Sequence, residues 1–322
     1  QAAIRDSSTS RGLGDVYKRQ AITNALCEGI RPHATHKRLS RNLDNPELSQ
    51  KFSDRLLKVG AAQVGKDTRL IVHMYELNKK YARKVEYLPS VENGESAGFR
   101  VCGIVANDLG SQNYVPLLAS VWSEDVPGYV SDTDEIKKVL YRVSAATGNR
   151  GMFYFDDKSV NDDLLLPILE EPSLNFVMWQ RSDASVVYRN KTCSLQEVAD
   201  SVETVYGKMM FKLLPKGVSG TSIDALSAGV EEAALHNIAA RNVTDLDLDL
   251  FVHAGVTAIK SKETGTSLRL IALKTKNRLI GEVVVPLITS AEDLRSRRAL
   301  MGLVESCLTI QDTLQAHHTL LE

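Results

Sequence analysis

The 322-residue chain contains no run of about 18 consecutive apolar residues, which is the length that a membrane-spanning helix requires. Its first residues, QAAIRDSSTSRGLGDVYKRQ, also lack the apolar segment of a secretory signal peptide. Apolar residues make up 43% of the chain and charged residues 25%, as in ordinary globular proteins. We therefore expect a cytoplasmic globular protein without a membrane partner.

Cysteine is scarce and scattered along the chain. The four cysteines, Cys27, Cys102, Cys193 and Cys307, form no CxxC pair. This spacing argues against a zinc site and against a disulfide scaffold. No Ser/His/Asp or Cys/His constellation stands out, and no phosphate-binding glycine loop follows a predicted strand.

An overall basic charge is missing too, because 39 Lys and Arg stand against 40 Asp and Glu. Binding to nucleic acid must therefore depend on local patches. In the first patch, Lys37, Arg38 and Arg41 share one face of a predicted helix, which fits phosphate contacts or a plain solvated surface. The second patch is KKYARK, residues 79–84, with the cations Lys79, Lys80, Arg83 and Lys84.

The patterning of the chain divides it into three parts. Residues 1–20 have no helical or strand periodicity, and we expect no structure there, whether they are a natural disordered leader or sequence foreign to the protein. Residues 21–62 are predicted to form two or three short helices, broken at Pro32 and around Asn45-Pro46. From Asp67 onward, strands and helices mix.

A mixed α/β sheet is the fold that this third part predicts. Strands are expected over residues 70–72, 99–105, 114–121, 152–155, 176–179, 185–188, 245–251, 268–273 and 279–288. Helices are expected over residues 133–147, 164–170, 194–206, 222–241 and 291–316, the first of them ending at Gly148.

Two of the predicted strands run directly into polar residues. Leu70-Ile71-Val72 leads into His73, and the strand 152–155 stops at Asp156-Asp157. Residues at the carboxyl ends of buried strands face the crevice in which ligands bind. We expect His73 and Asp156 to end adjacent strands of one mixed sheet, with their side chains on the same side.

Four segments resemble insertion-sequence transposases of the DDE type, and they occur in the correct order. They are ATHKRLSRNL (34–43), LIVHMYELNKKYARKVEYL (70–88), RVSAATGNRGMFYFDD (142–157) and ITSAEDLRSRRALMGLVESCLT (288–309). The resemblance implies an RNase H-like mixed sheet with flanking helices, a small N-terminal helical domain and an insertion before the last helix. It divides the chain into a helical DNA-binding region (21–62), the first part of the core (63–175), an insertion and sheet region (176–287) and a C-terminal core helix (288–322).

The resemblance also implies an enzyme that cleaves and joins DNA strands at the ends of insertion sequences. Its partners are double-stranded DNA and, as a further expectation, a second copy of the chain in a homodimer. Its expected cofactor is Mg²⁺, since in this chemistry two ions about 4 Å apart activate the nucleophile and stabilise the leaving oxygen. Mg²⁺ prefers oxygen ligands, so such a site is built from carboxylates.

The chain departs from the family pattern at two of the three carboxylates. His73 stands in the position of the first Asp, and Glu76 stands where a further family acid lies. Asp156 matches the second Asp and is the expected metal ligand. In the last helix the family's Tyr, Arg, Glu and Lys fall on Cys307, Ile310, Leu314 and Leu321. We therefore expect cleavage to be impaired and Mg²⁺ not to bind productively.

Three functions stay open on these residues. The chain is an impaired transposase, a non-catalytic DNA-binding or inhibitory derivative, or a histidine-based enzyme or interaction domain unrelated to DNA. His73 fits a residue that hydrogen-bonds a neighbouring strand, and also one paired with Asp156 without a metal. The neutral net charge keeps the third function open.

Overall fold

The computed structural model describes residues 24, 29–43, 46–78, 87, 98–108, 114–155, 162–171, 174–179, 184–204, 206–213, 248–277, 281–294 and 296–308. The chain divides into two compact units, residues 1–55 and 56–322. The first unit holds α2 (Pro32–Leu43) and the start of α3 (Pro46–Ala61). Each helix begins at a proline, because proline has no N–H to leave unbonded and its fixed φ suits the first helical position. The breaks predicted at these two prolines are therefore helix starts.

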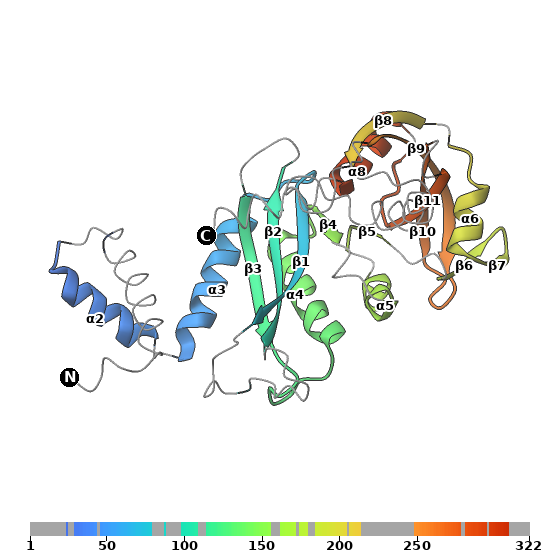
Figure 1. Ribbon diagram of the computed structural model, residues 1–322. Helices are drawn as coiled ribbons and strands as arrows, with labels where there is room; N and C mark the ends of the chain where they lie inside the picture. Colours follow the sequence, from blue (N-terminus) through green and yellow to red (C-terminus); the bar gives the residue numbers. More distant parts are fainter. Residues whose placement is uncertain are drawn as a thin grey trace, which may run out of the picture. The chain divides into compact units, whose positions relative to one another are not determined.

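Eleven strands among the described residues of the second unit join in one mixed sheet (Figure 1). They are β1 (Arg69–Asn78), β2 (Gly98–Asn107), β3 (Tyr114–Trp122), β4 (Met152–Phe155), β5 (Phe176–Trp179), β6 (Ser185–Tyr188), β7 (Lys191–Ser194), β8 (Tyr206–Leu213), β9 (Leu248–Ser261), β10 (Ser267–Asn277) and β11 (Gly281–Thr289). Their order is β3-β2-β1-β4-β5-β11-β10-β9-β6-β7, and β8 pairs with β9. The predicted mixed α/β class is confirmed.

Strand β1 lies between β2 and β4. It pairs with β2 in the antiparallel sense from Arg69 to Asn78, and with β4 in the parallel sense up to the pair Val72–Phe155. The predicted adjacency of these two strands is therefore confirmed. The prediction that the first strand ends at His73 is wrong, because β2 supplies backbone partners as far as Gly98 and β1 continues to Asn78.

Helices cover both faces of the sheet. On one face lie α4 (Asp132–Thr147), α5 (Asp162–Glu170) and α6 (Leu195–Ser201), whereas α8 (Arg297–Leu308) lies on the other. Side chains alternate along a strand, so Leu70 and Val72 share a buried core with α4, whereas Ile71 and Tyr154 share one with α8. We call the side of the sheet that carries Ile71 and Tyr154 the α8 face.

Local sequence signals fix the ends of α4 and the start of β4. The Ser131 hydroxyl accepts a hydrogen bond from the Asp134 N–H, which caps the helix, and Gly148 ends it in the left-handed conformation, as predicted. Gly151, just before β4, has a φ of +83°, and a Cβ there would lie 2.9 Å from Leu70 Cγ. A glycine therefore lets the chain enter β4 closely beside β1.

The structure differs from the prediction most clearly after residue 194. Helix α6 ends at Ser201 and strand β8 begins at Tyr206, so the predicted helix 194–206 is too long. Strands β7 and β8 were not predicted. The predicted helix 222–241 lies outside the described residues, and the strand predicted at 245–251 is described from Leu248, where β9 begins.

The last helix also starts later than residue 291. Helix α8 begins at Arg297, directly after Ser296, whose hydroxyl accepts a hydrogen bond from the N–H of Ala299. Serine in this position satisfies a backbone donor that the first helical turn leaves without a partner. Capping by Ser296 therefore sets the start of α8, and the buried Leu294 precedes it.

Candidate functional site

His73 lies on the α8 face of β1, one residue beyond the last parallel pair, Val72–Phe155. Across β2 its backbone partner is Gly103. Asp156, which follows Phe155 in the chain, lies outside the described residues. The predicted proximity of His73 and Asp156 therefore stays a prediction, although the strands that lead to them are neighbours.

The His73 imidazole packs against another ring of the same strand. Its centroid lies 5.3 Å from that of Tyr75, and the two ring planes differ by 23°, which is a stacked arrangement. Both residues project from the α8 face because they are two apart in a strand. Burial raises the pKa of Tyr75, and Cys102 raises it further. His73 is thus part of an aromatic pair, a contact that sequence reasoning missed although the spacing His-x-Tyr in a strand signals it.

Glu76 does not join His73. The two residues are three apart in one strand, so their side chains project from opposite faces of the sheet. Glu76 is exposed, and its backbone partner in β2 is Arg100. The period-2 alternation of a strand, had it been extended past His73, would have predicted this separation.

A core residue occupies the position that the resemblance assigns to a tyrosine. Cys307 in α8 is buried in the core of the α8 face, and burial raises the pKa of its thiol. A thiol held in the protonated state is a poor metal ligand. Cys307 is therefore a core residue, whereas Ile310, Leu314 and Leu321 lie outside the described residues.

A buried arginine joins three elements near Cys307. The Arg69 guanidinium at the start of β1 donates a hydrogen bond to the Asn107 side-chain oxygen in β2, and another, at 3.5 Å, to the Ser306 carbonyl in α8. Burial lowers the pKa of Arg69 and raises that of Tyr154 on the neighbouring strand. This cluster joins the last turn of α8 to the start of β1 and to β2.

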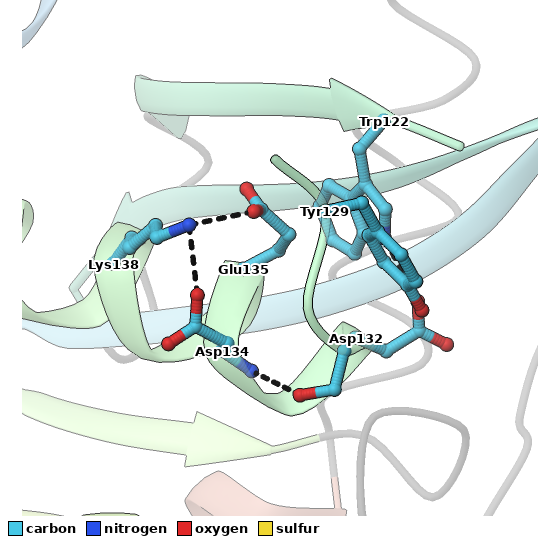
Figure 2. A network of polar contacts seen from close by, with 7 residues as sticks. Trp122, Tyr129, Asp132, Asp134, Glu135 and Lys138 are labelled. Atoms are coloured by element: carbon cyan, nitrogen blue, oxygen red, sulfur yellow. Dashed lines mark hydrogen bonds and ion pairs between the residues drawn. The ribbon is translucent and has the colours of Figure 1, made fainter. Parts of the chain in front are cut away.

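A second polar cluster stands at the start of α4 (Figure 2). The Asp132 carboxylate accepts hydrogen bonds from Trp122 Nε1 and Tyr129 OH, each at 2.9 Å, and from Arg100 Nη1 at 2.5 Å. Figure 2 also shows Lys138 between the carboxylates of Asp134 and Glu135. Three donors on one carboxylate fasten α4 to β2 and β3, so we assign Asp132 a structural role.

We expect Asp132→Asn to destabilise the fold by about 1–2 kcal/mol at neutral pH, because an amide nitrogen replaces an acceptor oxygen. Burial alone would raise the pKa of Asp132, but the hydrogen bonds from Trp122, Arg100 and Tyr129 outweigh it and lower the pKa. A depressed pKa stabilises the fold above the unfolded-state value, about pH 4, and this stabilisation is lost as the pH falls through the folded-state value. Urea denaturation at several pH values measures the difference in free energy of unfolding between the wild type and Asp132→Asn.

Asp134→Asn is the matched control, since Asp134 sits in the same helical turn and its carboxylate forms a solvent-exposed ion pair with Lys138. The difference in free energy of unfolding between the wild type and Asp132→Asn should shrink below about pH 4. The free energy of unfolding of Asp134→Asn should stay near that of the wild type at every pH. Equal losses in the two variants would contradict the role of Asp132.

Of the two predicted basic patches, only the first lies among the described residues. Lys37, Arg38 and Arg41 all lie in α2 and are exposed, with Lys37 and Arg41 one helical turn apart. The predicted helix and its cationic surface are present. The second patch, Lys79 to Lys84, lies outside the described residues and directly follows Asn78 in the sequence.

The described residues around His73 do not fit Mg²⁺. The position that the resemblance assigns to the first carboxylate holds a nitrogen donor, and the nearest acid along β1 projects from the other face. Mg²⁺ requires oxygen ligands in near-octahedral geometry. We therefore derive no chemical step that passes through a metal at this place.

Within the described ranges, no group of three or more His, Cys, Asp and Glu side chains is arranged to hold a metal ion. No helix in that part of the chain is long and apolar enough to cross a membrane. No family model matches the chain, and comparison with curated proteins gives no match.

Proposed function

We propose that the chain is a DNA-binding protein of the DDE transposase type, derived from enzymes that cut and join DNA and impaired in cleavage. One observation carries the proposal. The strands that lead to His73 and Asp156 are parallel neighbours in one mixed sheet, up to the pair Val72–Phe155. The RNase H-like core that the sequence resemblance implies requires this adjacency.

The order of the other elements supports the same proposal. An antiparallel β2 flanks β1, helix α4 follows β3, and α8 packs over the centre of the α8 face. Within this arrangement His73 occupies the place of the first carboxylate and Cys307 that of the tyrosine in the last helix. A histidine nitrogen and a buried thiol cannot replace a carboxylate cage for Mg²⁺. We therefore propose binding to duplex DNA as the activity retained.

Helix α2 is the described surface best suited to phosphate contacts. Lys37, Arg38 and Arg41 are exposed on it, and no acidic residue occupies its first turn. Phosphate contacts are independent of base sequence and release counterions, so binding through them weakens as salt rises. Lys79, Lys80, Arg83 and Lys84 add a second cationic segment in the sequence.

We expect salt-sensitive binding of duplex DNA, measured by fluorescence anisotropy of a labelled duplex pool over a series of salt concentrations. The Lys37→Ala, Arg38→Ala, Arg41→Ala triple variant should flatten the plot of log K against log salt by about 0.9 for each phosphate that the protein no longer neutralises. The variant in which Lys79, Lys80, Arg83 and Lys84 become Ala should flatten it as well.

A triple variant of Lys191, Lys260 and Lys262 to Ala removes the same charge from exposed positions of the sheet unit and serves as control. This control variant should leave the slope of log K against log salt nearly unchanged. No measurable duplex binding by the wild type at about 50 mM salt would reject the DNA-binding function and favour an interaction domain unrelated to DNA.

A non-catalytic inhibitor is the second candidate function. The observation that favours it is the burial of Cys307 in the core of α8, where the family pattern places a polar residue. Such a chain would occupy element ends without cutting them. Competition with an active transposase for the same duplex separates this candidate from an enzyme with slow cleavage.

A further inference from the structure

Strand β3 forms one end of the sheet. Within the described part of the chain it pairs only with β2, so no strand of that part lies along its outer edge. The backbone of such an edge can bond a further strand, and proteins usually prevent this with charges, proline, a bulge or a covering element. The distribution of these features along β3 therefore indicates where another strand can pair.

The first half of β3 carries several of these protective features. Pro116 has no N–H to donate, and a Cβ at Gly60 of α3 would lie 3.2 Å from the Pro116 carbonyl oxygen, so the helix lies against this part of the strand. The register between β2 and β3 shifts at Leu117, which is skipped in the pairing. A bulge of this kind bends the strand and disrupts the local hydrogen-bond ladder.

The second half of β3, residues 118–122, lacks proline, bulge and charge. The whole strand, YVPLLASVW, contains no charged residue. Ala119 and Val121 are exposed, and the exposed fraction of Val121 is 54%. The other end of the sheet differs, since β7 is only four residues long and begins with Lys191. Short and charged edges discourage further pairing, so of the two ends β3 is the one suited to accept another strand.

The residues of this open edge favour a second copy of the same strand as the occupant. Directly paired residues project from the same side of a sheet, so a two-fold axis normal to the sheet pairs residues an even number apart. An axis through Ser120 pairs Leu118 with Trp122 of the second copy, and Ala119 with Val121 of the second copy. The small Ala119 leaves room for the exposed Val121, and no like charges oppose each other across the two strands.

We propose that two copies of the chain pair through residues 118–122 of β3, in the antiparallel sense and with Ser120 on the two-fold axis. The pairing occupies the open edge of each copy, so assembly stops at a dimer with one continuous sheet. A strand pair of this length is a small interface, below the roughly 1,200 Å² of a stable complex, and we expect a dimer that dissociates at micromolar concentrations. The inference goes beyond the proposed DNA-binding function and does not depend on it.

Sedimentation velocity of the full chain over a concentration series measures the monomer–dimer equilibrium. The double variant Ala119→Lys, Val121→Lys opposes like charges twice in the dimer and should raise the dissociation constant at least about tenfold. The double variant Ala119→Glu, Val121→Glu should do the same. When the two variants are mixed in equal amounts, they should form a heterodimer, because each introduced lysine then opposes an introduced glutamate.

The control variant Leu166→Lys, Thr192→Lys adds the same charge at exposed positions of α5 and β7, and it should dimerise as the wild type does. Far-UV circular dichroism of each variant alone checks that it folds. A measurement that needs no variant is hydrogen exchange of the wild type. Exchange at residues 118–122 should slow as the protein concentration rises, because pairing engages their backbone N–H groups.

Three results would overturn the inference. The first is a wild-type chain that stays monomeric at concentrations up to about 1 mM. The second is a dimer that the doubly lysine-substituted variant forms as readily as the wild type, since the interface would then lie elsewhere. The third is a pair of folded, oppositely charged variants that stay monomeric when mixed, because the register centred on Ser120 requires their heterodimer.

Discussion

Duplex DNA incubated with the unmodified chain and Mg²⁺ is expected to remain uncut. Strand cleavage by two metal ions needs carboxylates that hold both ions about 4 Å apart. Of the three positions that the family resemblance assigns, only Asp156 carries a carboxylate in this chain. A loss of about 4 kcal/mol of transition-state stabilisation for one missing metal-positioning group already slows the reaction nearly a thousandfold, and two groups are missing here.

The substrate for this experiment is obtained by selection. Duplexes that bind the full chain are enriched from a random-sequence pool, cloned into a supercoiled plasmid and tested for nicking with Mg²⁺. His73→Asp alone should leave the plasmid intact, because Leu314 still occupies the position that the resemblance assigns to the third carboxylate. The variant with both His73→Asp and Leu314→Glu is expected to nick the plasmid at a low rate, since it restores all three carboxylates.

The outcome that contradicts this expectation is nicking by the unmodified chain that depends on Mg²⁺ and disappears in Asp156→Ala. Such a result would mean that an acid other than those matched to the family completes the site. Retained binding of the selected duplex by all of these variants is the necessary control, because loss of binding would prevent cleavage for a different reason.

The sequence predicted the fold best where local signals and burial agree. Leu70-Ile71-Val72 and Met152–Phe155 are short runs of large apolar residues, and both are central strands buried on their two faces. Serine at position 131 and glycine at position 148 bracket α4 as helix caps do. Each of these features depends on neighbours in the chain, so a pattern of a few residues is sufficient to predict it.

Features that depend on distant residues could not be read in the same way. The continuation of β1 to Asn78 follows from its long antiparallel partner, which supplies hydrogen bonds to a polar stretch. Asp132 looks like any acid in a first helical turn, and its importance comes from Arg100, a residue of another strand. Tertiary pairing overrides local preference in both cases.

Within the candidate site the sequence identified His73 but not its surroundings. The resemblance placed Glu76 beside it, whereas strand alternation separates the two residues onto opposite faces. The stacked partner of His73 is Tyr75, and this contact becomes apparent only when the strand is known to continue past His73. A family pattern assigns residues to positions, but the surface they form depends on the sheet.

Replacement of Arg69 by methionine is expected to lower the free energy of unfolding by about 3 kcal/mol. The guanidinium is buried and donates to the Asn107 side chain and to the Ser306 carbonyl in the last turn of α8. Methionine fills a similar volume but leaves the buried Asn107 oxygen without this donor, and an unsatisfied buried acceptor is destabilising. A cation near the end of a helix also interacts favourably with the helix dipole, and this interaction is lost too.

A double-mutant cycle separates the hydrogen bond from simple packing. Arg69→Met and Asn107→Leu should each destabilise the fold, but the double variant should be more stable than the sum of the two losses predicts, because it leaves neither polar partner buried alone. Urea denaturation followed by tryptophan fluorescence reports each value, and Arg298→Met, at an exposed position of the same helix, is the control. Two results would each show that the buried arginine does not hold α8 against the sheet. One is that Arg69→Met lowers the free energy of unfolding no more than Arg298→Met does, and the other is that the two losses in the cycle are strictly additive.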